Sequence, residues 1–275
     1  MALMDSTVNF FYNILPYVIF DYGIDTLTFP WPERTVPYRL DENFSVRMRQ
    51  TIYDAMDEIE KYSCVRFVHY DPEAHGKKVF LDVVPLSERL CFANIGYHPR
   101  KSRILGLHQE GCSRRGVVIH EFLHVLGMQH THQRKDRDEH VEVYRKNVVS
   151  NRRNQFHKTF SEYYGLPYDL QSLMHYDMRV FAKAGAGHTM RVREIKDASG
   201  ARTTPLSYAK KTRMSCGDIA WVNRVYGCRC HYLGDDLPGA MPYADWLKSK
   251  MGKEKYDMLD YLVPNKSNCR GSRKE

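Results

Sequence analysis

Between residues 45 and 62 the apolar positions recur at helical spacing. They fall at 48, 52, 55, 56, 59 and 62, which places them along one stripe of an α-helix. Ser45, or Asn43 just before it, has a side chain suited to cap the first turn. The pattern therefore predicts an amphipathic helix that starts after the cap and ends near Tyr62.

Short runs of β-branched and apolar residues follow that helix, at 65–70, 78–84 and 103–107. Their length and composition are typical of strands. Glycine and serine residues at 111, 113 and 116 then interrupt the pattern before a second helix, which carries His120 and His124. Helix, strands and helix in this order predict an upper lobe of the α+β class, with a sheet and helices packed on it.

Beyond residue 127 the chain becomes irregular and polar until residues 212–226, whose apolar positions suit another helix. We expect an irregular lower lobe, with the substrate lying in a cleft between the lobes. Apolar positions in the tail, at 246, 247, 251, 256 and 259, suit one amphipathic helix. The tail either packs on the domain or binds a partner. We therefore divide the chain into an N-terminal segment (1–30), a catalytic domain (31–230) and a tail (231–275).

Composition narrows the class of protein. The chain has 275 residues, 43% of them hydrophobic, and a formal net charge of +8. Lys and Arg are spread along it without a dense basic run, so we expect a solvated basic surface and no nucleic-acid partner. The apolar stretch 9–20 is interrupted by Asn13 and Pro16 and is too short to span a bilayer. It also makes a poor signal peptide, and residues 1–30 are interpreted as a propeptide remnant or a processed start.

The chemistry is concentrated at residues 120–130, HEFLHVLGMQH. On a helix His120 and His124 lie about 40° apart on one face, one turn from each other, so both imidazoles can bind one zinc ion. Glu121 projects beside them and can act as a base toward a metal-bound water. Histidines buried for structural reasons alone would leave this glutamate and the following glycine unexplained.

A third ligand requires the helix to end. In a continuous helix His130 would lie about 15 Å along the axis from His120, too far to share an ion. Gly127 is the residue suited to end the helix in a left-handed conformation and to let the chain bring His130 back. Three neutral protein ligands leave an open coordination position, which is typical of a catalytic rather than a structural zinc.

The segments after this motif indicate a family. Residues 131–138 read THQRKDRD, and SLMHY follows at 172–176. Together with the histidine motif they resemble the astacin family of zinc endopeptidases, among the metzincins. The resemblance implies a two-lobed metzincin fold, one zinc per chain on His120, His124 and His130, and Glu121 as the catalytic base and acid.

The resemblance also implies roles outside the zinc helix. Met174 would be the methionine of the turn beneath the three histidines, and Tyr176 the tyrosine that contacts zinc at rest and then stabilises the transition state. Where the family usually has a glutamate that pairs with the buried mature amino terminus, this chain has Thr131. We therefore expect the amino terminus not to be buried there, and residues 1–30 to be compatible with activity. His132 and His175 are expected to be hydrogen-bonded structural residues.

Within the motif at residues 131–138, residues 134–138 carry adjacent charges of both signs. We expect them to form a paired network that braces the floor of the site, because buried charges must be paired.

Seven cysteines without a Cys-x-x-Cys pair favour structural disulfides and a secreted, extracellular protein over a cysteine metal site. Reduced buried thiols are the alternative. The family resemblance implies the pairs Cys64–Cys230 and Cys91–Cys112. Among Cys216, Cys228 and Cys269, two could pair, leaving one free or bound to another chain.

Two functions are consistent with this sequence. The first is an active zinc endopeptidase that acts on protein or peptide substrates, expected to be a monomer without a transmembrane segment. The second is a weak or inactive binding or toxin-like module on the same scaffold. Such a module is expected to have lost Glu121 or a ligand, and all of them are present, so the enzyme is favoured.

Overall fold

A mixed sheet forms the first lobe of the protein. The computed structural model describes residues 30–76, 79–193, 211–253 and 255–257. Its main sheet has five strands in the order β2-β1-β3-β5-β4, parallel except that β4 runs antiparallel to β5. The strands are β1 (Thr35–Leu40), β2 (Arg66–His69), β3 (Leu81–Leu86), β4 (Cys91–Ala93) and β5 (Arg103–His108). The strands expected at 65–70, 78–84 and 103–107 are thus found, with each end within three residues of its predicted position.

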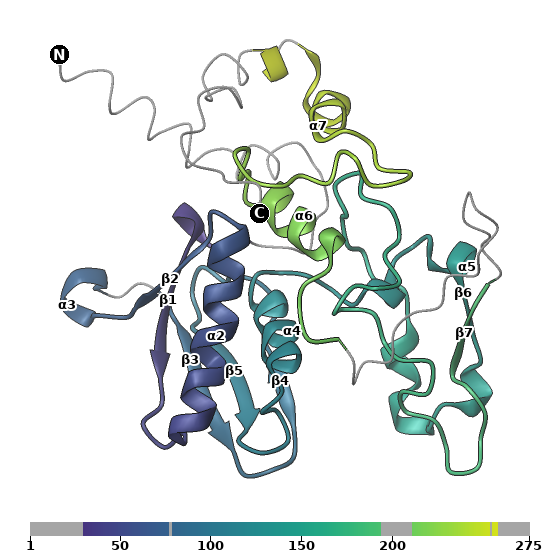
Figure 1. Cartoon of the computed structure of the whole chain (residues 1–275), viewed down its shortest axis with the longest axis horizontal. Helices are drawn as coiled ribbons and strands as arrows, with labels where there is room; N and C mark the ends of the chain where they lie inside the picture. The colour runs from purple at the N-terminus through teal and green to yellow at the C-terminus, as the bar shows by residue number, and fades with distance from the viewer. Residues whose placement is uncertain (1–29, 77–78, 194–210, 254, 258–275) are drawn as a thin grey trace.

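Two helices pack side by side on this sheet, α2 (Val46–Tyr62) and α4 (Arg115–Val125) (Figure 1). Ser45 caps α2, because its side chain accepts a hydrogen bond from the Met48 amide, as its sequence predicts. The apolar stripe of α2 is buried. Helix α4 is buried on nearly every side, which fits a segment enclosed between the sheet, α2 and the second lobe.

After Gly127 the chain enters the second lobe, which is built mostly of turns and short helices (Figure 1). Strands β6 (Val141–Val143) and β7 (Met190–Val192) pair antiparallel. The short helices here are η2 (Thr131–Gln133), α5 (Arg137–His140), η3 (Arg145–Asn147) and η4 (Ser150–Phe156), whereas η1 (Pro32–Arg34) and α3 (Pro72–His75) belong to the first lobe. A small core of its own, separate from the main one, lies in this lobe. The predicted α+β class with an irregular lower lobe is therefore confirmed.

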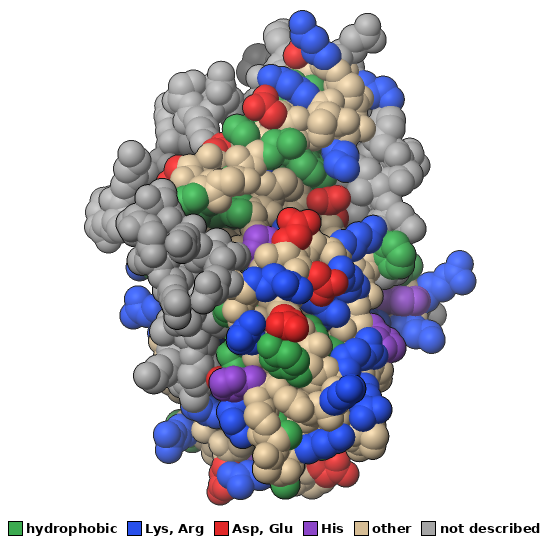
Figure 2. Space-filling model, turned by 90° about the vertical axis from the view of Figure 1, so that its right-hand side faces the viewer, with side chains coloured by type: hydrophobic (Ala, Val, Ile, Leu, Met, Phe, Trp, Pro, Cys, Tyr) green, Lys and Arg blue, Asp and Glu red, His purple; other side chains and the backbone are tan. Residues whose placement is uncertain are grey.

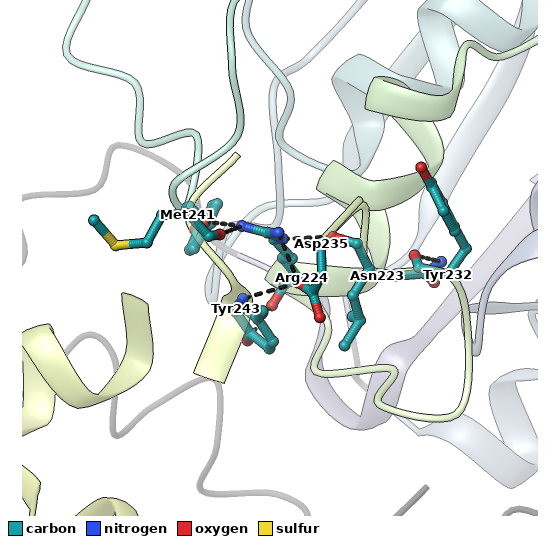
Figure 3. A network of polar contacts seen from close by, with 8 residues as sticks. Asn223, Arg224, Tyr232, Asp235, Met241 and Tyr243 are labelled. Atoms are coloured by element: carbon teal, nitrogen blue, oxygen red, sulfur yellow. Dashed lines mark hydrogen bonds and ion pairs between the residues drawn. The ribbon is translucent and has the colours of Figure 1, made fainter. Parts of the chain in front are cut away.

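The described part of the tail packs against residues 31–230. Helix α6 (Cys216–Val225) carries Arg224, which is fully buried and donates to the carbonyl oxygens of Leu233 at 2.7 Å and Met241 at 3.0 Å. The same guanidinium forms an ion pair with Asp235 at 3.0 Å. Tyr243, the first residue of α7 (Tyr243–Met251), returns a hydrogen bond to the Arg224 carbonyl (Figure 3). A buried cation needs such partners, so Arg224 holds the tail against α6.

One implied disulfide is wrong. Cys91 and Cys112 are bonded as expected, but Cys64 is bonded to Cys228 rather than to Cys230. Helix α6 ends at Val225, and the turn that follows, with Gly227 at φ 61°, directs the Cys228 amide back onto the Asn223 carbonyl. Asn223 also donates to the Tyr62 carbonyl at the end of α2, two residues before Cys64.

The turn therefore brings Cys228 to Cys64 and carries Cys230 past it. Cys230 is itself disulfide-bonded. Among the described cysteines Cys216 is the free one, and it is exposed.

The surface carries the excess positive charge in a dispersed form. Figure 2 shows Lys and Arg side chains across one face with fewer acidic ones between them. Among the described residues no helix is long and apolar enough to cross a membrane. The predicted N-terminal segment lies outside the described residues except for Pro30.

Candidate catalytic metal centre

Helix α4 supplies the first two histidines of the site. His120 and His124 are buried one turn apart, with ring centroids separated by 4.8 Å and ring planes nearly perpendicular. This is the placement that the i, i+4 spacing predicts. The helix is rigid here, because the sheet and α2 enclose it, and the two rings therefore have a fixed separation.

The chain turns at Gly127, as predicted. Helix α4 ends at Val125, and Gly127 has φ 104°, a conformation that residues with a side chain rarely adopt. The turn is closed by hydrogen bonds from the Gly127 amide to the His124 carbonyl and from the Met128 amide to the Leu123 carbonyl. His130 follows immediately and returns to the histidines of α4.

The three imidazoles converge on one point. The Nε2 atom of His130 lies 3.2 Å from that of His124 and 3.3 Å from that of His120, and the ligand atoms of all three residues lie within 4.8 Å of one another. A tetrahedral zinc ion with Zn–N distances of roughly 2.0–2.1 Å separates its ligand nitrogens by about 3.3 Å. The spacing of the histidines fits a single zinc ion.

The outer nitrogen of each α4 histidine is fixed by the backbone. The Nδ1 of His120 donates to the Leu173 carbonyl at 2.8 Å, and that of His124 to the Met128 carbonyl at 2.7 Å. Each ring then carries its proton on Nδ1, so its Nε2 is a bare acceptor aimed at the common point. Two such acceptors aimed at one point repel each other unless a cation lies between them, so these two rings favour a metal ion.

Burial keeps these rings neutral. Mainly because of desolvation, the pKa of His120 falls to about 3 and that of His124 to about 4, and the pKa of His130 is also well below its ordinary value. Neutral imidazole is the form that binds a metal. The site is therefore in its ligand form throughout the neutral range.

Glu121 lies beside the ligands in the apolar interior. It is 6% exposed, and burial raises the pKa of its carboxyl to about 8. In the described part of the chain no Lys or Arg forms an ion pair with it. A carboxyl with a pKa raised toward neutrality is suited both to accept and to return a proton.

Tyr176 borders the same point from the second lobe. Its ring centroid lies 4.5 Å from that of His130, and its ring stacks on His132 at 3.9 Å. Burial, followed by the nearby Glu121 carboxylate, raises the pKa of its phenol to about 12. The phenol therefore keeps its proton at neutral pH and can donate a hydrogen bond.

A buried turn at residues 172–175 lies behind the histidines. Met174 is fully buried, and its carbonyl accepts a hydrogen bond from the Thr131 amide at 3.0 Å. This bond joins the turn to the residue that follows His130. The side chain of Thr131 donates to Ser172 Oγ at 3.0 Å, and Ser172 Oγ donates to Asp218 at 2.6 Å. Thr131 is thus satisfied within the protein, beside a cavity of about 10 Å³.

The other predicted structural residues are found in their expected roles. His132 hydrogen-bonds the Gln155 carbonyl and His175 the hydroxyl of Tyr168. The expected charged network is present: Arg134 pairs with Asp136 and Arg137 with Asp138, and both arginines are buried and also donate to backbone carbonyls.

Sequence reasoning missed the groups that orient the ligands and the turn. The carbonyls of Leu173 and Met128 have no sequence signal, since any residue carries one. Asp218 had one, because Ser215 and Asp218 form a capping box at the start of α6. Lys211 contacts the turn as well, and nothing in its sequence neighbourhood indicated it.

Comparison with known proteins identifies the family. The family model described as astacin, a family of peptidases, matches residues 24–227. This chain belongs to the astacin family. The predicted resemblance, metalloendopeptidase activity and fold class are thereby confirmed, and nothing in the comparisons favours the non-catalytic alternative.

Several astacin relatives are similar over most of this chain. The low choriolytic enzyme of Oryzias latipes is 32% identical over 203 residues, which cover 72% of this chain and 69% of that protein. The astacin-like metalloendopeptidase of Mus musculus is 30% identical over 205 residues, 72% of this chain but only 43% of the relative. The solved structure of high choriolytic enzyme 1, a hatching enzyme zinc-protease from Oryzias latipes, superposes with a TM-score of 0.62 at 26% sequence identity. The match covers 74% of this chain and 95% of that one.

Proposed function

We propose that this astacin-family chain binds one zinc ion through His120, His124 and His130 and hydrolyses peptide bonds of protein substrates with Glu121 and Tyr176 as its catalytic residues. The observation that carries the proposal is the convergence of three imidazoles, in which the Nε2 of His130 lies 3.2 Å from that of His124 and 3.3 Å from that of His120. These two separations match the ligand spacing of a tetrahedral zinc. Three protein ligands leave a position open for chemistry. When bound, zinc supplies a Lewis acid and lowers the pKa of water at that position to about 7.

Glu121 is the proton carrier in this proposal. It follows a ligand directly on α4, so its carboxyl is held near the reacting atoms. As general base it removes the proton of the attacking water, and as general acid it gives that proton to the leaving amine. Its burial supports this role, because a carboxyl removed from water and without a paired Lys or Arg among the described residues takes up a proton more readily than an exposed one.

Tyr176 stabilises the developing negative charge. Its phenol is protonated at neutral pH and lies beside His130, so it can donate a hydrogen bond to the oxyanion of the tetrahedral transition state. A preorganised donor of this kind contributes more in a water-poor site than in solution. His132, which stacks on its ring, keeps the ring in place.

The disulfides and the surface charge support an extracellular location for the enzyme and the absence of a nucleic-acid partner. Disulfides Cys64–Cys228 and Cys91–Cys112 form in oxidising compartments, which supports an extracellular, secreted enzyme. We infer that it acts as a monomer on protein or peptide substrates, that residues 31–230 form its catalytic domain, and that its dispersed basic surface serves solubility and not nucleic-acid binding.

Casein or gelatin digestion by the purified protein tests the proposal, with metal content measured on the same sample. We expect about one zinc per chain, loss of digestion after dialysis against a zinc chelator, and recovery on returning zinc. A protein that contains no zinc, or that digests equally well after chelation, contradicts the proposal. Magnesium added to the chelated sample in place of zinc is the control for non-specific effects of divalent ions.

A further inference from the structure

Lys211 is a buried cation that contacts the turn behind the zinc ligands. The residue is 7% exposed, and its Nζ donates to the carbonyl of Ser172 at 2.7 Å and to that of His175 at 3.1 Å. These two carbonyls bracket the turn at 172–175. An ammonium group is suited to this place because it offers several donors that converge from one atom, while a backbone amide offers one.

The segment that carries Lys211 is itself fixed against α4. A Cβ atom added at Gly116, in the first turn of α4, would clash with the Lys211 carbonyl oxygen, so only glycine permits this approach. Three residues further on, the Met214 amide donates to Glu58 of α2 at 2.9 Å, and Glu58 also pairs with Arg115 at the start of α4. Lys211 therefore extends from a backbone anchored to the zinc helix toward the turn of the second lobe.

Asp218 holds the same turn by accepting hydrogen bonds from it. Its buried carboxylate accepts from Ser172 Oγ at 2.6 Å and from the Leu173 amide at 2.9 Å. The carbonyl of Leu173 then accepts the Nδ1 proton of His120 at 2.8 Å. The orientation of His120 is thus connected to Asp218 through Leu173, and to Lys211 through the carbonyls at the two ends of the same turn.

Burying the charged Lys211 side chain costs free energy, because the ammonium group loses its hydration. Desolvation lowers the pKa of Lys211 to about 8, while Asp218 and two further carboxylates act in the opposite direction. An apolar side chain of similar length would avoid that cost, and buried charges replaced by apolar residues often leave a fold as stable as before. Packing alone therefore does not account for a lysine at this position.

We propose that Lys211 is a positioning residue of the catalytic centre: by holding the Ser172 and His175 carbonyls it fixes the turn whose Leu173 carbonyl orients His120. The inference rests on the proposed function, since it concerns the ligand set of the proposed zinc. Its effect is indirect, because Lys211 touches neither the ligands' Nε2 atoms nor the substrate. Groups that orient metal ligands typically contribute about 10–100-fold to metal affinity or activity.

Three variants test the proposal. Lys211→Met removes the donors and the charge at similar length, Lys211→Arg keeps both, and Lys61→Met removes an exposed lysine at the end of α2 as the matched control. Each is measured for kcat and KM on a peptide substrate, for metal affinity by competition with a chelator, and for the visible spectrum of the cobalt-substituted protein. Thermal unfolding of the metal-free protein reports the fold independently.

We expect Lys211→Met to lower kcat by about 10–100-fold with little change in KM, to weaken metal binding by a similar factor, and to alter the cobalt spectrum. Lys211→Arg should restore most of each loss, and Lys61→Met should match the unmodified protein. Wild-type kcat, affinity and spectrum in Lys211→Met would overturn the proposal, as would a melting temperature that falls while affinity and spectrum stay unchanged.

The role of Lys211 can still be tested if the variant does not fold or if the unmodified protein is inactive. If Lys211→Met does not fold, Lys211→Gln, which keeps a donor without the charge, is measured instead under the same criteria. If the unmodified protein binds metal but cleaves no substrate, the proposed function fails, and the affinity and cobalt spectra still decide on Lys211.

Discussion

The ring of Tyr176 lies 4.5 Å from the ring of His130, centroid to centroid. The two residues are 46 positions apart in sequence and belong to different segments of the second lobe, so the contact exists only in the folded protein. It places a protonated phenol beside the proposed third zinc ligand. This relationship leads to the first prediction.

Tyr176→Phe is expected to keep zinc and the fold while reducing turnover by about 10–10³-fold, the range for loss of one oxyanion donor. A group that acts mainly in the transition state lowers kcat and kcat/KM together and leaves KM nearly unchanged. Steady-state kinetics on a peptide substrate, with zinc content measured in parallel, check this. An increase in KM alone would show that the phenol binds substrate instead.

Glu121→Gln should retain zinc, because Glu121 is not among the converging nitrogens, yet lose nearly all peptidase activity. General acid–base catalysis alone contributes about 10²–10⁴-fold. The amide is nearly isosteric and cannot take the proton. Residual activity above a tenth of the unmodified rate, in a variant with full zinc content, would contradict the role given to Glu121.

His124→Ala should lose both zinc and activity, because two imidazoles at 3.3 Å remain where three converged. Metal analysis after gel filtration is the measurement. His157→Ala is the matched control, since His157 is exposed and lies outside the three-histidine group. Equal zinc in the His124 variant and the control would show that the metal binds elsewhere.

Peptide mapping without reduction should yield Cys64 joined to Cys228 and Cys91 joined to Cys112. Cys216 is exposed and free, so it should react with a thiol reagent in the native protein, whereas the four bonded cysteines should not. Labelling of all of these cysteines without reductant would contradict the disulfides and remove the support for an extracellular enzyme.

Removal of residues 1–30 should leave activity within a few-fold. Thr131 is uncharged, its hydroxyl is satisfied by Ser172, and the cavity beside it measures about 10 Å³, room for about one water. Residue 131 offers no carboxylate to a newly formed amino terminus, and the two carboxylates that border the cavity, Asp169 and Asp218, already accept hydrogen bonds within the protein. Strict dependence of activity on that cleavage, or a crystal structure with the new terminus beside Thr131, would refute the prediction.

Much of the fold could be predicted from residue patterns because those patterns are local. The stripe of α2 and the cap at Ser45 are properties of neighbouring turns. The strand β1 was missed, and its proline at position 37 explains this, since tertiary pairing with β2 and β3 and not local preference forms it. The antiparallel pair of β6 and β7 was also missed, because its strands have three residues each and lie far apart in the sequence.

The partner of Cys64 could not be predicted from the family pattern. Cys228 and Cys230 differ by two residues, and both follow the same helix. Only the turn at Gly227 and the contact between Asn223 and the Tyr62 carbonyl decide which one reaches Cys64. A spacing rule cannot distinguish them, because a disulfide depends on a Cα separation, here 5.4 Å, that the tertiary fold sets.

The sequence by itself determined the elements of the proposed metal site: two histidines one helical turn apart, a glutamate beside them and a glycine that ends the helix. Each follows from helix geometry and from the conformational freedom of one residue, which are local. Only the tertiary structure decided what orients those groups, namely the Leu173 and Met128 carbonyls, the buried Lys211 and Asp218, and the approach of Tyr176 to His130. These contacts join segments far apart in the chain, and packing of the two lobes, which no local pattern encodes, brings them together.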